Sequence, residues 1–139
     1  MRWSTGIVLL VDRASEALEV LRTALHSTDF VLLQATTGDE ALAVLSRLQF
    51  PVDLAIVDLE LPDDDGVVVS LLTILARRKI TKIIVKTSRQ DKPFLEKVKY
   101  LGIDALVLKP ISAEQFVGAV QTALTARMDS PGASAGTAA

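Results

Sequence analysis

The sequence predicts an α/β protein, a (βα)5 fold in which helices cover both faces of a parallel β-sheet. The first observation behind this prediction is that short apolar runs alternate with stretches whose leucines recur at helical spacing. The second is that half of the 139 residues are hydrophobic, which is enough for one core and one domain. The third is what the composition excludes. A net charge of -2 offers no basic surface for nucleic acid, and a chain without cysteine has neither disulfides nor thiolate metal sites.

The apolar runs predict five strands, because they are short, rich in β-branched residues and followed by turn residues. They are Gly6–Val11, Phe30–Leu33, Leu54–Val57, Lys82–Lys86 and Ala105–Leu108. Each run is followed by a stretch with helical periodicity, at Ala14–Leu25, Ala41–Leu48, Val68–Leu75, Leu95–Leu101 and Phe116–Leu124. Ser112 and Gln115 form a capping-box pattern before the last of these helices.

The domain organisation follows from the ends of the chain. The final residues are rich in Pro, Gly, Ser and Ala, so we expect a folded domain over residues 1–127 and a disordered tail over 128–139. No apolar run approaches the length of a membrane span, and the chain enters a strand-like run too early for a signal peptide. We therefore expect a cytoplasmic protein without direct contact to membrane or nucleic acid.

Strands that alternate with helices form a parallel sheet, and the common five-stranded doubly wound order is the flavodoxin-like 2-1-3-4-5. The switch point of this order lies between the first and third strands. It places Asp12 and Asp58 side by side at the carboxyl edge of the sheet. The ends of the fourth and fifth strands bring Thr87, Ser88 and Lys109 to the same edge.

The residues at this edge predict phosphoryl-transfer chemistry. Packing explains poorly why a buried apolar strand ends on Asp58, directly before a loop with Pro62, three aspartates and Gly66. The three aspartates, residues 63–65, are expected to form a solvated loop. Paired carboxylates bind a hard divalent cation such as Mg²⁺, while a hydroxyl and an ammonium group bind a phosphoryl group. Such groups catalyse phosphoryl transfer by positioning and charge neutralisation.

Five motifs, in order along the chain, resemble those of the receiver domain of bacterial two-component response regulators, of the stand-alone chemotaxis-regulator type. The motifs are Leu10–Asp12, Gly38–Leu42, Asp58–Gly66, Thr87–Ser88 and Lys109–Pro110. Each alone is weak, but each stands at the end of the appropriate predicted element. The resemblance covers residues 6–125 and extends to a proline that usually follows a cis peptide bond.

The resemblance implies a role for each site residue. Asp58 would accept a phosphoryl group from a histidine kinase or phosphotransfer protein. Mg²⁺ would be held by Asp12, Asp58 and the backbone carbonyl of Glu60. Thr87 would bond a phosphoryl oxygen, and Lys109 would neutralise its charge. Such a protein is a signalling domain and not an enzyme, acts on a downstream protein target, and can pair through its fourth helix, fifth strand and fifth helix.

The chain departs from the resembled pattern at three positions. Arg13 stands where a second acid normally binds the metal, and it has no lone pair to donate. Its side chain either faces solvent or lies as a built-in cation over Asp58, where it would weaken Mg²⁺ binding relative to an Arg13→Asp variant. Lys86 stands where an apolar residue is usual, and we expect it to extend to solvent. Leu106 replaces a frequent aromatic switch residue.

Two functions therefore stay open at this stage. The first is a Mg²⁺-dependent switch phosphorylated on Asp58. The second is a phosphorylation-independent pseudo-receiver that acts as a protein-interaction module. Asp58, Thr87 and Lys109 favour the first function, whereas Arg13 and Leu106 favour the second. His26 lies among leucines and polar residues on a predicted helix, which indicates a surface or packing role and not a phosphohistidine.

Overall fold

The computed structural model describes residues 5–129 of the chain. Its centre is a five-stranded parallel sheet in the order β2-β1-β3-β4-β5, as predicted. The strands are β1 (Thr5–Val11), β2 (Asp29–Ala35), β3 (Leu54–Asp58), β4 (Lys82–Thr87) and β5 (Ala105–Leu108). Two of them continue past their apolar runs, because β3 includes Asp58 and β4 includes Thr87. Both residues are thus fixed by the sheet and do not lie in a loop.

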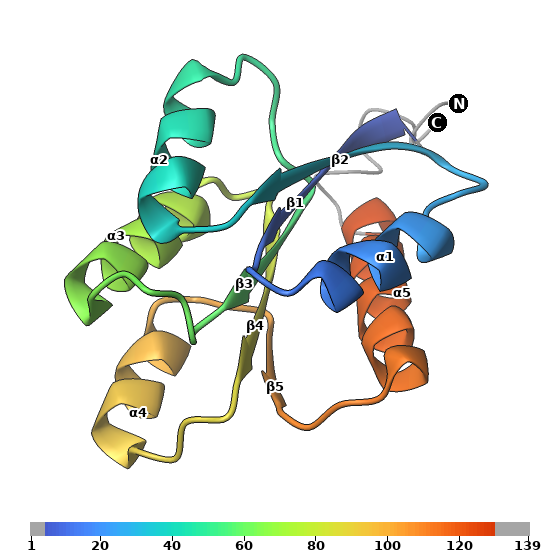
Figure 1. Cartoon of the computed structure of the whole chain (residues 1–139). Coiled ribbons are helices and arrows are strands. Elements are labelled where there is room, and N and C mark those ends of the chain that lie inside the picture. Colours follow the sequence, from blue (N-terminus) through green and yellow to red (C-terminus); the bar gives the residue numbers. More distant parts are fainter. Residues whose placement is uncertain (1–4, 130–139) are drawn as a thin grey trace.

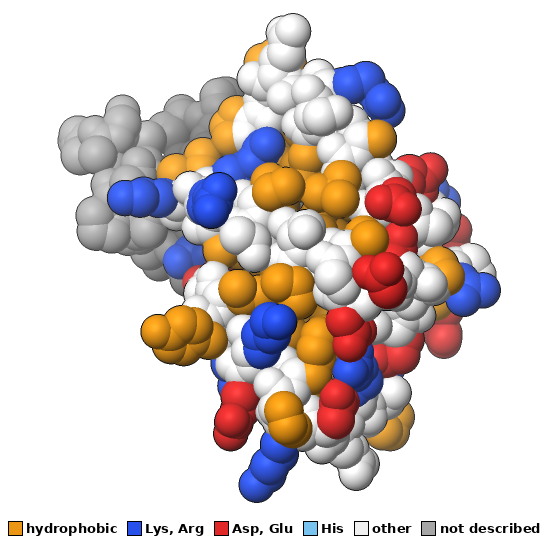
Figure 2. Space-filling model, turned by 90° about the vertical axis from the view of Figure 1, so that its left-hand side faces the viewer, with side chains coloured by type: hydrophobic (Ala, Val, Ile, Leu, Met, Phe, Trp, Pro, Cys, Tyr) orange, Lys and Arg blue, Asp and Glu red, His pale blue; other side chains and the backbone are white. Residues whose placement is uncertain are grey.

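The helices form a layer on each side of the sheet (Figure 1). They are α1 (Ser15–Ala24), α2 (Gly38–Arg47), α3 (Asp65–Arg77), α4 (Lys92–Tyr100) and α5 (Ala113–Asp129). Helices α1 and α5 cover one face, and α2, α3 and α4 cover the other (Figure 1). Figure 2 views the side that carries α2, α3 and α4, where charged groups separate the hydrophobic patches and acidic side chains gather toward the right.

Two hydrophobic cores follow from the alternation of side chains along each strand. On β3, Leu54 and Ile56 pack under α1 and α5, whereas Ala55 and Val57 pack under α2–α4. The fourth strand alternates in the same way, with Ile84 on the α1–α5 side. Parity along a strand therefore decides which helix layer a side chain meets, and this rule also applies to the polar residues at the strand ends.

The helix boundaries have local causes. The predicted capping box before α5 is confirmed: the Gln115 backbone N–H donates to the Ser112 hydroxyl at 3.0 Å, and the Ser112 N–H donates to the Gln115 side chain at 3.1 Å. The turn after α4 has Gly102 at a φ of 96°, a conformation that favours glycine. The Lys109–Pro110 peptide bond is cis, as the resemblance implies.

The ends of the chain are only partly described. Helix α5 continues to Asp129, so the first two residues of the expected tail are helical. The rest of that expected tail, residues 130–139, lies outside the described residues. Within residues 5–129, no helix is long and apolar enough to cross a membrane.

Candidate functional site

The carboxyl edge of the sheet holds a pocket built from the ends of β1, β3, β4 and β5. Val11 and Val57 are partners in the β1–β3 register, so Asp12 and Asp58, one residue further along, arrive at the same level. Asp58 is in turn the register partner of Lys86 on β4. Asp12, Asp58, Lys86 and Lys109 line one cavity of about 300 Å³, which Phe116 and the start of α5 also border. The predicted grouping at this edge is confirmed for Asp12, Asp58 and Lys109.

The Asp58 carboxylate is held by the ammonium group of Lys109. The Lys109 Nζ atom lies 2.9 Å from both Asp58 Oδ1 and Asp58 Oδ2. The backbone N–H of Glu60 donates a further hydrogen bond of 2.8 Å to Asp58 Oδ1. Asp58 itself is 6% exposed, so this charge lies almost entirely inside the protein. Its position is consequently rigid, because a buried carboxylate without its partners would be strongly destabilising.

A second buried ion pair lies beside the first. Asp12 is 1% exposed. Its Oδ1 atom accepts the Ala14 N–H at 2.8 Å, and its Oδ2 atom lies 2.7 Å from the Lys86 Nζ atom. Among the described residues Asp12 Oδ2 has no directed hydrogen bond, so its contact with Lys86 is ionic. The Lys86 ammonium also stands 4.6 Å from the centroid of the Phe116 ring.

The expectation that Lys86 extends to solvent is wrong, because its side chain is only 7% exposed. Lys86 has the same strand parity as Ile84 and therefore points under α5, where Phe116 covers it. From there its flexible stem can reach Asp12 across the end of β3. The signal was present in the sequence as a lysine inside a buried strand, but its partner Asp12 follows a strand far away in the chain.

The Glu60 side chain completes the polar network, a role that the sequence does not indicate. The resemblance implies a role only for the backbone carbonyl of this residue. The Glu60 carboxylate accepts hydrogen bonds from the Thr87 hydroxyl at 2.8 Å and from the Ser88 N–H at 2.9 Å. It also lies 2.9 Å from the Lys109 Nζ atom. Lys109 therefore bridges two carboxylates, and Thr87 donates to Glu60 the hydrogen bond that was expected to go to a phosphoryl oxygen.

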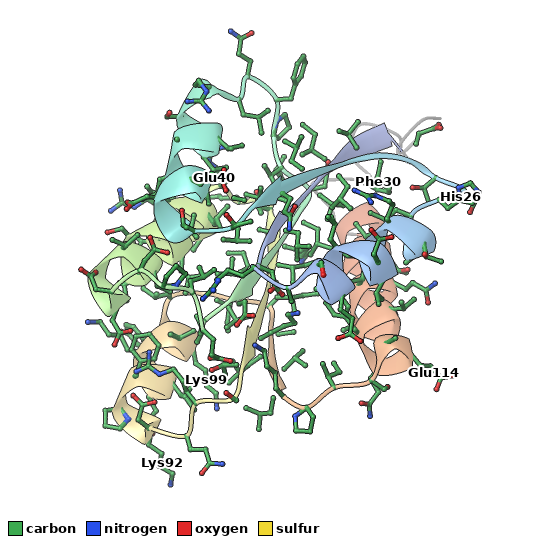
Figure 3. The ribbon with its side chains drawn as sticks, viewed as in Figure 1. His26, Phe30, Glu40, Lys92, Lys99 and Glu114 are labelled. Carbon is green, nitrogen blue, oxygen red and sulfur yellow. The ribbon has the colours of Figure 1, made fainter. Side chains whose placement is uncertain are left out.

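Arg13 takes the first of its two possible orientations, because it is exposed and is absent from the lining of the pocket. It makes no ion pair with any residue in the described part of the chain. His26 is also exposed, in the turn between α1 and β2 (Figure 3). That turn precedes the amino end of β2, whereas Asp58 stands at the carboxyl end of β3. The half-buried Leu106 packs against the α2–α4 core.

The acidic loop after β3 is more than the solvated segment that the sequence predicts. The Asp63 carboxylate accepts backbone N–H groups of Gly38 at 2.5 Å and Asp39 at 3.2 Å, and so caps α2 from a distance in sequence. Asp64 caps α3 through a 3.0 Å bond from the Val67 N–H. Asp65 pairs with Arg89 at 2.8 Å. These contacts anchor the loop because unpaired N–H groups at a helix start attract carboxylates.

The expected Mg²⁺ site does not fit the side chains as they lie. Both Asp58 oxygens bind the Lys109 ammonium, and Asp12 Oδ2 binds the Lys86 ammonium. The Glu60 carboxylate points to Thr87, Ser88 and Lys109. No group of three or more acidic or imidazole side chains within residues 5–129 is arranged to hold a metal ion. Mg²⁺ requires free oxygen ligands in octahedral geometry, and here ammonium groups occupy the oxygens.

Burial and hydrogen bonding shift three pKa values in the network. Burial raises the pKa of the Asp58 carboxyl above its ordinary value, although the bonds from Lys109 and Glu60 N–H act against this rise. Burial would also raise the pKa of Glu60, but hydrogen bonds from Lys109, Thr87 and Ser88 outweigh it and lower the pKa. Burial alone would lower the pKa of Lys109, but its bonds to Asp58 and Glu60 raise it. Lys109 is therefore charged at neutral pH.

The two carboxyl groups bound to Lys109 are therefore predicted to have pKa values shifted in opposite directions. Followed by carboxyl ¹³C shifts, Asp58 should titrate above its ordinary 3.8 and Glu60 below its ordinary 4.5. The ionised Glu60 then contributes stability that is complete above pH 4.5 and is lost as the pH falls through its lower folded pKa. A Lys109→Met variant should raise both pKa values, whereas the exposed Lys99→Met control should change neither. An unchanged Glu60 midpoint in Lys109→Met would contradict this network.

The buried Lys86–Asp12 pair predicts a strong thermodynamic coupling. Lys86→Met leaves an unpaired carboxylate inside the protein and should lower the free energy of unfolding by roughly 3 to 5 kcal/mol. In the double variant Asp12→Asn/Lys86→Met, no charge needs a partner, so the loss should be smaller than the sum of the two single losses. Lys82→Met is the matched control on the same strand, since its 3.7 Å pair with Asp104 is partly exposed. Chemical denaturation measures all four variants, and additive losses would contradict the pairing.

Comparison with known proteins agrees with this geometry. The response regulator receiver domain model matches residues 8–121. The chain is 32% identical over 120 residues to the transcriptional regulatory protein KdpE of Mycobacterium tuberculosis, covering 85% of this chain and 50% of that protein. It is 29% identical over 117 residues to ResD of Bacillus subtilis, covering 84% and 47%. The chain thus spans about half the length of the curated relatives it matches.

Solved structures show the same fold. A CheY-like receiver domain protein from Methanospirillum hungatei superposes with a TM-score of 0.73 at 24% identity, over 88% of this chain and 96% of that one. A receiver domain from Pseudomonas fluorescens gives 0.70 at 27% identity, over 88% of each chain. Receiver domains are signalling domains that interact with histidine kinases or phosphotransfer proteins and generally bind Mg²⁺ at the phosphorylation site. With its five-stranded order and its Asp58–Lys109 pair at the carboxyl edge, this chain belongs to the response regulator receiver domain family.

Proposed function

We propose that this chain is a phosphoacceptor switch in which Asp58 receives a phosphoryl group from a histidine kinase or phosphotransfer protein. The observation that carries the proposal is the contact of the Lys109 ammonium with both Asp58 oxygens at 2.9 Å. This contact presents a carboxylate nucleophile beside a fixed positive charge, in a pocket at the strand ends. The alternative, a phosphorylation-independent interaction module, would not require the Asp58–Lys109 ion pair, and no observation favours it.

The proposed step is transfer of a phosphoryl group from phosphohistidine. An Asp58 oxygen attacks phosphorus, a P–O bond forms and the P–N bond of the donor breaks. The electron pair of the broken bond stays on the imidazole, which takes up a proton from solvent. Lys109 neutralises charge on the transferred oxygens, and positioning supplies most of the rate. The expected Mg²⁺ ligands, Asp12, Asp58 and the Glu60 carbonyl, take no metal-dependent part in this step because the pocket does not fit the ion.

Glu60 connects the proposed phosphorylation to the surface. In the described state its carboxylate binds Thr87, Ser88 and Lys109. A phosphoryl group on Asp58 would compete for the Thr87 hydroxyl and the Lys109 ammonium, and its negative charge would repel Glu60. Release of Glu60 frees the Ser88 N–H and thus the start of the β4–α4 loop. The switch therefore operates by exchanging one anion for another at the end of β4.

We propose that the surface of α4, β5 and α5 presents this change to a downstream protein or to a second copy of the chain. Tyr100 at the end of α4 is 93% exposed, and Leu108 at the end of β5 is 61% exposed. Leu108 directly precedes the pocket residue Lys109, and Tyr100 ends the helix that follows the loop held by Glu60. The site would at most assist its own phosphoryl transfer and dephosphorylation. We expect it to act in the cytoplasm, where kinases obtain ATP.

The direct test is incubation with a small phosphodonor, with and without Mg²⁺, followed by intact-mass measurement. We expect the mass of one phosphoryl group on the wild-type protein and none on Asp58→Asn. Asp29→Asn, at the exposed start of β2, is the matched control and should be modified like the wild type. Lys109→Ala should retain the fold by circular dichroism but lose any phosphorylation-dependent change in amide shifts. Equal modification of Asp58→Asn would exclude Asp58 as the acceptor.

The competition between Glu60 and the phosphoryl group predicts a change in rate. Glu60→Ala removes an anion that occupies Thr87 and Lys109, so phosphorylation by the same donor should be faster by about tenfold, the equivalent of one charged hydrogen bond. The exposed Glu96→Gln on α4 is the control, with the same loss of charge outside the network. The time course of the mass change gives the rates. A slower reaction in Glu60→Ala would mean that Glu60 positions the site and does not compete for it.

A further inference from the structure

We propose that Lys86 is a resident cation of this receiver pocket: its ammonium group takes the place of a divalent metal ion, so that the wild-type pocket excludes Mg²⁺. The inference concerns the same pocket as the proposed function but does not rest on it. Metal binding can be measured without a phosphodonor, so one proposal can fail while the other holds.

The charges of the cavity lining leave little attraction for a divalent cation. Asp12, Glu16 and Asp58 each bring one negative charge, and Lys86 and Lys109 each bring one positive charge, so these groups carry a net charge of -1. Without Lys86 the same lining would carry -2. A divalent cation entering the pocket would also meet two ammonium groups at short range. At low effective dielectric this repulsion is large, whereas the same pocket without Lys86 would attract the ion.

Ammonium groups already occupy the carboxylate oxygens that a metal ion would need. The Lys86 Nζ atom lies 2.7 Å from Asp12 Oδ2, the oxygen of Asp12 that does not bind Ala14. This oxygen is buried and has no directed hydrogen bond among the described residues, so its charge is satisfied by the ammonium group alone. A metal ion at Asp12 would have to displace Lys86 from that oxygen. Asp58 offers no substitute, because Lys109 contacts both of its oxygens.

The Lys86 ammonium group cannot easily leave the pocket. Its side chain is 7% exposed, and the Phe116 ring lies 4.6 Å from its ammonium group. The strand fixes its backbone opposite Asp58, with a 2.9 Å hydrogen bond from Leu59 N–H to the Lys86 carbonyl. Moving the ammonium to solvent would leave the carboxylate of Asp12 buried without a partner, which is strongly unfavourable. The cation is therefore part of the folded structure.

Arg13 lies outside the pocket. It is exposed and does not line the cavity, so it neither fills the pocket nor contacts Asp58. Restoring an acid there, as in Arg13→Asp, would add a carboxylate at the mouth of the pocket while Lys86 remained on Asp12. We therefore expect Lys86, and not Arg13, to exclude Mg²⁺ from the pocket.

The experiment is a Mg²⁺ titration of the unphosphorylated full chain, followed by the amide shifts of Asp12, Asp58 and Glu60. We expect no saturable shift for the wild type up to about 10 mM Mg²⁺, and none for the Lys82→Met control. Lys86→Met should bind Mg²⁺ at least roughly tenfold more tightly, since a unit charge is removed at contact distance. Lys86→Gln, which retains a polar end, gives a second folded variant for the same titration. Arg13→Asp should stay close to the wild type.

Stability provides an independent measurement. An ion that binds only the folded chain raises the denaturation midpoint. Mg²⁺ should therefore raise the midpoint of Lys86→Met and Lys86→Gln and leave that of the wild type unchanged. Saturable binding by the wild type at the Asp12 and Asp58 amides, with an affinity equal to that of the Lys86 variants, would overturn the proposal. So would the absence of any Mg²⁺ effect on both folded variants.

Discussion

The arrangement of this receiver domain depends on the buried ion pair between Lys86 and Asp12. Asp12 is 1% exposed, and a buried carboxylate without a counter-charge strongly destabilises the fold. Here the counter-charge comes from Lys86 on β4, which is separated from β1 by β3. The Lys86 side chain, which α5 covers, reaches Asp12 across the end of β3. Because both partners are rigidly placed by the sheet, the pocket next to Asp58 has its cation built in.

A covalently attached cation differs from a metal ion in what it can do. A metal ion exchanges with solvent and supplies several coordination positions, whereas an ammonium group supplies three donors at a place set by its stem. In the proposed pocket Lys86 is a permanent cation, so the charge balance around Asp58 does not depend on the concentration of a divalent ion. The cost is a core whose stability relies on a paired charge.

The second network links the pocket to the outer loops. Glu60 binds Thr87, Ser88 and Lys109. Arg89, the residue after Ser88, pairs with Asp65 and Asp91. Its guanidinium group also lies 3.7 Å from the Phe94 ring. A change of anion at the end of β4 is therefore adjacent to the contacts that join the β4–α4 loop to α3 and α4. This continuity gives the proposed phosphorylation a physical path to the surface without a large movement of the sheet.

Periodicity and the order of the elements determined most of the fold from the sequence by itself. Strands and helices that alternate along a chain can pack in only a few ways. The parallel doubly wound order places Asp12, Asp58 and Lys109 at one edge. The sequence also placed Lys109 at the edge that holds Asp58, because each residue lies at the carboxyl end of a parallel strand.

Only the tertiary structure decided where the long and charged side chains point. Lys86 turns inward, Arg13 turns outward, and the Glu60 carboxylate reaches β4. A flexible side chain with several rotatable bonds adopts the orientation that its neighbours in space make favourable, and those neighbours come from distant parts of the chain. The position of a backbone atom follows from local pattern, but the partner of a buried charge follows from the packing of the whole domain.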